Sequence, residues 1–227
     1  MELATVSQTG LGPWPLPQED DAQPTMGATG DILLFSGDTW AARTVKWTTC
    51  SIWSHVALLI HEPELASEPL VWEATRCSPL QDIRHGVCIG DGVQLVRLRD
   101  KLAHYPGRIM LRRWRGAPRP SWAEVLAAMH EHQTRPYLDY VRSNLRAWWG
   151  GEARMGTFCS EFVVDVLRAW KFLAPGRPSR LYVPRHLAAS LAAESHYGDP
   201  SQPQALLARK PWRTLQQACE DDLCLRA

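Results

Sequence analysis

The sequence lacks a long hydrophobic run, a marked net charge and a regular pattern of cysteines. No window of about 18 residues is uninterruptedly apolar, so no membrane-spanning helix is expected. The first residues carry prolines and acids instead of a basic start followed by an apolar segment, so no secretory signal is expected. The 25 Lys and Arg residues balance the 24 Asp and Glu residues, which gives no general argument for a nucleic-acid or membrane partner. These absences predict a cytoplasmic protein without a membrane span.

The cysteines show neither the spacing of a disulfide framework nor that of a zinc site. Cys219 and Cys224 lie close together, but no second pair of ligands has zinc-like spacing. We therefore expect mostly reduced thiols and no metal. Of the 227 residues, 45% are hydrophobic and 22% are charged, which is the composition of an ordinary globular protein.

Three segments differ in composition. Residues 1–29 are rich in proline, glutamine and acids and are expected to form an irregular, mobile leader. Residues 30–195 are the predicted main domain, and residues 196–227 are a C-terminal extension rich in proline and glutamine at its start.

Short apolar runs bounded by turn residues predict about five strands, at 32–35, 56–60, 70–75, 93–98 and 108–114. Ser121 and Glu124 form a capping box that predicts the start of a helix. A second helix is expected from Cys159 to about residue 173, and a short third one at 185–194. The predicted fold class is α+β, with a short antiparallel sheet or half-barrel and helices packed on one side.

Cys159 is the most informative candidate for chemistry. Thr157 is a plausible N-cap, which would place Cys159 in the first turn of its helix. The partial positive charge at a helix start favours a thiolate over a thiol. Cys159 also shares a helix face with Phe162 and Val163, so it is expected to point toward the sheet.

A thiolate nucleophile needs a base, and His55 begins an otherwise apolar strand. Glu73, in the next strand, is the candidate for orienting the imidazole. Direct pairing of 55 with 73 would centre the hairpin on Glu64, whereas a shifted register would put Glu73 diagonal to His55 or farther away. Each residue also has a plain structural interpretation: a buried cysteine, a structural histidine and a solvated strand glutamate.

The order of five segments resembles a known family. Each segment carries one short motif: Gly30-Asp31-Ile32-Leu33-Leu34-Phe35, Ser54-His55-Val56-Ala57, Trp72-Glu73-Ala74, Arg135-Pro136-Tyr137 and Phe158-Cys159-Ser160-Glu161-Phe162. Together they resemble the circularly permuted branch of the NlpC-type papain-like superfamily, in which the His strand precedes the Cys helix. That branch includes bacterial permuted papain-like amidases and, more distantly, the lecithin:retinol acyltransferase group. The resemblance covers roughly residues 28–190.

The resemblance implies a catalytic domain with Cys159 as nucleophile, His55 as base and Glu73 as the group that orients His55. It also implies that Tyr137 lies near the active site, in a substrate or oxyanion region that would include Ser160. Trp148 and Trp149 stand in an insert that would line a substrate groove or form a packed aromatic pair.

The implied reaction is attack of the Cys159 thiolate on an amide carbonyl of a peptide or acyl-amide, through a thioacyl-enzyme, with no cofactor. Acyl transfer, or hydrolysis of a lipid or thioester on the same triad, is the first alternative, and a lipid substrate is then possible. A catalytically inactive binding module is the second. Nucleic acid is not expected as a partner, because the arginines around Trp114 are interpreted as a solvated strand edge; they are Arg108, Arg112, Arg113, Arg115 and Arg119.

Overall fold

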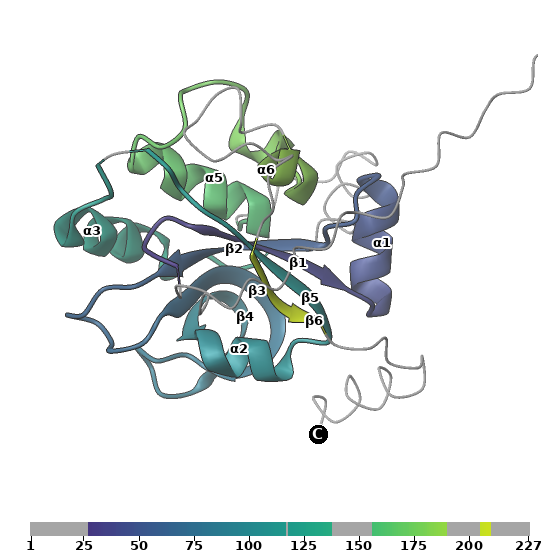
Figure 1. Ribbon diagram of the computed structural model, residues 1–227, viewed down its shortest axis with the longest axis horizontal. Coiled ribbons are helices and arrows are strands. Elements are labelled where there is room, and N and C mark those ends of the chain that lie inside the picture. The colour runs from purple at the N-terminus through teal and green to yellow at the C-terminus, as the bar shows by residue number, and fades with distance from the viewer. Residues whose placement is uncertain (1–26, 117, 138–155, 190–204, 210–227) are drawn as a thin grey trace, which may run out of the picture.

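The computed structural model describes residues 27–116, 118–137, 156–189 and 205–209, and it is built on one antiparallel sheet. The sheet has six strands in the order β4-β3-β2-β1-β5-β6 (Figure 1). The strands are β1 (Ile32–Gly37), β2 (His55–Ile60), β3 (Leu70–Gln81), β4 (Cys88–Arg97), β5 (Gly107–Arg112) and β6 (Ala205–Arg209). The mixed α+β class expected from the sequence is confirmed.

Five helices and one 3-10 turn accompany the sheet in the described ranges. The capping box predicted at Ser121 is present, since the Ser121 hydroxyl accepts from the Glu124 amide and the Glu124 carboxylate accepts from the Ser121 amide. The helices are α1 (Trp40–Thr48), α2 (Leu98–His104), α3 (Trp122–His132), α5 (Cys159–Ala169) and α6 (Pro184–Ala189), and the 3-10 turn is η1 (Ser179–Leu181).

The two faces of the sheet carry different layers. Alternate residues of β1, such as Ile32 and Leu34, point to the face covered by α3, α5 and α6. Leu33 and Phe35 point to the opposite face, where α2 supplies Leu98. The expectation of helices on one side only is therefore wrong for α2, because its apolar residues pack on the second face. Figure 1 shows α2 on the side of the sheet away from α5.

All five strands expected from the apolar runs are present, and β3 and β4 are longer than predicted. They continue beyond the buried part of the sheet through two register shifts, between Thr75 and Ser78 and between Ser78 and Gln81. β6 was not expected, and it adds a strand from the predicted C-terminal extension to the edge at β5. No described helix is long and apolar enough to cross a bilayer.

Asp31 fixes the start of β1. Its buried carboxylate accepts from the backbone amides of Ala28 at 3.0 Å and Trp114 at 2.9 Å, and it lies 3.1 Å from a guanidinium nitrogen of Arg119. The Gly30-Asp31 motif is thus a structural device that ties the entry of the central strand to the end of β5. Satisfying these buried donors with one carboxylate stabilises the strand on which the rest of the site is built.

Candidate active site

His55 and Glu73 meet across neighbouring strands. β2 and β3 pair as Leu58 with Trp72 and Leu59 with Val71, and continuing this register places residue 57 opposite Glu73. His55 is therefore diagonal to Glu73 on the same face of the sheet. The His55 Nε2 atom lies 2.6 Å from Glu73 Oε2, and Glu73 is fully buried. The sequence allowed either direct pairing of His55 with Glu73 or a shifted register, and the strands adopt the shifted register.

The other oxygen of Glu73 is held by two further side chains. Oε1 accepts from Lys101 Nζ at 2.5 Å and from Gln94 Nε2 at 2.8 Å, and Gln94 also donates to Ser78 Oγ. Burial raises the pKa of the Glu73 carboxyl, but the charge of Lys101 and the bond to His55 outweigh it and hold that pKa well below its usual range. Glu73 is thus a buried, negatively charged partner of His55 whose position is fixed by Lys101 and Gln94.

The pKa of His55 is raised to about 9. Burial alone would lower it, but the charge and hydrogen bond of Cys159, together with those of Glu73, favour the protonated ring. Nε2 interacts with Glu73, and a second side-chain hydrogen bond joins the His55 ring to Cys159. His55 therefore stands between a sulfur on one side and a buried carboxylate on the other.

Cys159 begins α5 and is 7% exposed. It belongs to the apolar layer that includes Phe162 and Val163, as the helix phase predicted. The predicted cap is wrong, however: Phe158 is the N-cap, and its amide is bound by the Glu161 carboxylate at 3.3 Å. Thr157 instead takes part in a parallel bridge, in which its amide donates to the Pro136 carbonyl at 2.9 Å.

That bridge places Tyr137 beside Thr157, and Thr157 precedes Cys159 by two residues. Ser160 does not face the site in the same way, because its buried hydroxyl donates to the Tyr182 carbonyl at 2.6 Å. That bond ties α5 to the segment before α6, and the place of Ser160 in a substrate or oxyanion region stays a prediction. Trp148 and Trp149 fall outside the described residues.

Lys101 and Tyr105 form a support that the sequence analysis missed. Tyr105 packs edge-on against Phe35 with 5.0 Å between ring centroids, and Phe35 lies 5.2 Å from the His55 ring. Burial raises the pKa of the Tyr105 hydroxyl, which bonds to Ser54. The spacing of Leu98, Lys101 and Tyr105 places a lysine on an apolar helix face, but the helix is too short for this spacing to mark a functional residue in the sequence.

The sequence suggested that the arginines around Trp114 form a solvated strand edge. The structure shows that two of them are not part of such an edge. Arg112 is buried and donates to the Leu187 carbonyl at 2.5 Å. Arg119 donates to the Thr29 carbonyl at 2.6 Å and contacts Asp31. These two side chains are therefore used inside the fold.

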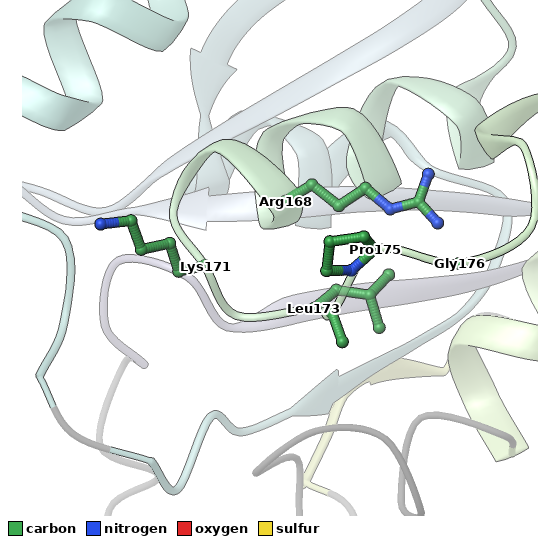
Figure 2. Close-up of a pocket in the computed structure, with 6 residues that line it drawn as sticks. Arg168, Lys171, Leu173, Pro175 and Gly176 are labelled. Atoms are coloured by element: carbon green, nitrogen blue, oxygen red, sulfur yellow. The ribbon is translucent and has the colours of Figure 1, made fainter.

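A cavity of about 350 Å³ lies at the other end of α5, beside Arg168 and Leu173. The helix has 11 residues, so this cavity is separated from Cys159 by about 15 Å of helix. Figure 2 shows the Arg168 and Lys171 side chains pointing in opposite directions. Arg168 is already committed to Ser179 Oγ and the Arg177 carbonyl. This cavity is therefore separate from the Cys159–His55–Glu73 cluster.

Comparison with known proteins adds little to this geometry. No protein-family model and no curated protein matches the chain. A solved structure described as the metalloprotein yiiX from Escherichia coli O157:H7, DUF1105, is similar over 83% of this chain and 99% of its own, with 17% identity and a TM-score of 0.45. A likeness of this size establishes neither fold nor function. In the described part of this chain, no group of three or more His, Cys, Asp or Glu side chains is placed to hold a metal ion.

Proposed function

We propose that the protein is a cysteine hydrolase of the permuted papain-like type, acting on an amide bond of a peptide or acyl-amide. The observation that carries the proposal is the position of His55, whose ring interacts with Cys159 and, at 2.6 Å, with the buried Glu73 carboxylate. A sulfur, an imidazole and an orienting acid in series are what nucleophilic acyl transfer requires. The chain order, with the His strand before the Cys helix, agrees with the permuted arrangement.

In the first half-reaction, the Cys159 sulfur attacks the substrate carbonyl carbon and forms a C–S bond. The first amides of α5 have no partner within the helix, so the Cys159 N–H is a donor for the resulting oxyanion. The tetrahedral adduct then collapses, the C–N bond breaks, and protonated His55 delivers its proton to the leaving amine. The products are a thioacyl-enzyme and a neutral imidazole.

In the second half-reaction, neutral His55 removes a proton from water while the water oxygen bonds to the acyl carbon. The C–S bond breaks, the acid is released, and the Cys159–His55 pair is restored. Glu73 holds the ring in one orientation through both steps and stabilises its charged form. An amine or alcohol in place of water would give acyl transfer through the same thioacyl-enzyme.

Acylation of Cys159 tests the proposal directly. An activated ester such as p-nitrophenyl acetate should add one acetyl group to the peptide that contains Cys159, and water should remove it on further incubation. Cys159→Ala should abolish the adduct, whereas Cys50→Ala, which removes an exposed thiol, should leave it unchanged. The proposal would be overturned if the parent carried no acetyl group at Cys159 and its other peptides were acetylated as much as those of the Cys159→Ala protein.

A further inference from the structure

Helix α1 turns its large apolar side chains away from the protein. Trp40 is 71% exposed and Trp47 is 82% exposed, while none of the nine residues of α1 is buried. The side of α1 that faces the protein carries half-buried residues, among them Ala42, next to Gly37 of β1, and Lys46, whose ammonium donates to the Gly37 carbonyl at 2.6 Å. An ordinary surface helix has the opposite arrangement, with its apolar stripe toward the core.

The two tryptophans form one outward ridge. They are seven residues apart, so they share a side of the helix at a separation of about 10 Å along its axis. Arg43 lies between them on the same side, since it is three residues from one and four from the other. We call Trp40, Arg43 and Trp47 the α1 face. Ile52, 44% exposed, follows in the loop beyond the helix.

The surroundings of the α1 face are positively charged. Residues 39–53 contain Arg43 and Lys46 and no aspartate or glutamate. The pKa of Lys46 is lowered first by burial and also by the neighbouring charges of Arg43 and Arg108, against an opposing effect of Asp38. Arg108 of β5 therefore extends the positive charge beyond the helix.

We infer that the α1 face docks on an anionic phospholipid bilayer. α1 is a short helix that carries exposed tryptophans beside cations and no acids, which suits a bilayer interface. Indole rings insert at the level of the lipid headgroups, and cations are attracted to anionic lipids. A protein partner would be matched by shape. The exposed charge beside this ridge is positive, because the neighbouring carboxylate of Asp38 is buried, and positive charge fits a surface of the opposite sign. The inference does not depend on the proposed reaction.

Docking through the α1 face would bring the bilayer close to the candidate active site. α1 is the connection between β1 and β2, and β2 begins with His55 (Figure 1). The Gly37 amide at the end of β1 donates to Ser54 Oγ, which joins the two ends of this connection beside His55. A lipid-borne acyl group would thus be presented at the same end of the sheet as the nucleophile.

Sedimentation with vesicles tests the inference. The full chain should bind phosphatidylcholine vesicles that contain phosphatidylserine, and bind much less to phosphatidylcholine alone. Trp40→Ala and Trp47→Ala should each lower the affinity roughly tenfold, because each removes one indole ring that would enter the bilayer. Arg43→Gln should lower it about fivefold, because it removes one surface cation. Leu126→Ala on α3 removes an exposed side chain far from α1 and should change nothing.

None of the three residues of the α1 face is buried, so the variants should keep the thermal unfolding temperature of the parent. Binding that is absent, that is equal on neutral vesicles, or that survives both tryptophan substitutions would overturn the inference. Concentration-dependent self-association without vesicles that is abolished by Trp40→Ala would also overturn it, by showing that a second copy of the chain covers this face. Activity on a soluble substrate should be unaffected by Trp47→Ala, which separates failure of docking from failure of the proposed reaction.

Discussion

Glu73 lies diagonal to His55 across two paired strands, and its Oε2 atom is 2.6 Å from the ring nitrogen Nε2. The same ring also interacts with Cys159, so His55 links the buried carboxylate to the sulfur. The second oxygen of the Glu73 carboxylate remains free for Lys101 and Gln94, which fix the carboxylate from below. The candidate triad is therefore supported by a buried charge network on the second face of the sheet.

Lys101 is expected to stabilise the fold through Glu73. Lys101→Met leaves a buried carboxylate with fewer partners and should lower the free energy of unfolding by about 3 kcal/mol. The double variant Lys101→Met/Glu73→Gln should be less destabilised than the sum of the two single variants, because the unpaired charge is gone. Urea denaturation measures all three proteins, with Asp100→Asn on the same helix as control. Strict additivity would show that Lys101 and Glu73 do not act as a pair.

The ring of His55 is expected to titrate with a midpoint of about 9, which proton NMR of its C2 hydrogen can follow. Glu73→Gln and Cys159→Ala should each move the midpoint down, since each removes a group that favours the protonated ring. Glu68→Gln, which removes a carboxylate that pairs with Arg97 and Arg99 at the surface, should leave it unchanged. A midpoint near the ordinary value of about 6.5 in the parent protein would contradict the network.

The raised pKa of His55 also predicts how stability changes with pH. A group whose pKa is higher in the folded than in the unfolded protein stabilises the fold fully below the unfolded value, here about 6.5. That contribution is lost as pH rises through about 9. The difference in unfolding free energy between the parent and His55→Gln should therefore shrink over this window. A difference that grows with pH would give the pKa shift the opposite sign.

Much of this fold could be predicted from the sequence where the pattern is local. The runs at Ile32 and Val56 are apolar, short and bounded by turn residues, which describes a buried strand whatever its neighbours are. The stripe of Phe162 and Val163 likewise fixed the buried side of α5, including Cys159. The meeting of His55 and Glu73 was proposed from their strands, but the register that makes it diagonal depends on the hairpin between them.

What could not be predicted depends on distant partners. Lys101 is recognisable as part of the site only once α2 packs on β3 and β4, because a lone lysine in seven residues of helix has no marked pattern. Thr157 has the chemistry of an N-cap, but its backbone is used by the bridge to Tyr137, and the Glu161 carboxylate accepts from the Phe158 amide instead. β6 pairs with β5, which lies far from it in the sequence, and residues 205–209 alone show no alternating strand pattern.

The most direct test of the account is the rate at which iodoacetamide alkylates Cys159 as a function of pH, read by peptide mass spectrometry. Free thiols titrate near about 8.5, and activated ones at roughly 3.5–7.5. The account predicts fast alkylation of Cys159 at a pH of about 6 that collapses in His55→Ala, with Cys50, Cys77 and Cys88 as exposed references in the same digest. Slow alkylation at that pH with the same profile in both proteins would contradict it, because His55 would then not activate the sulfur.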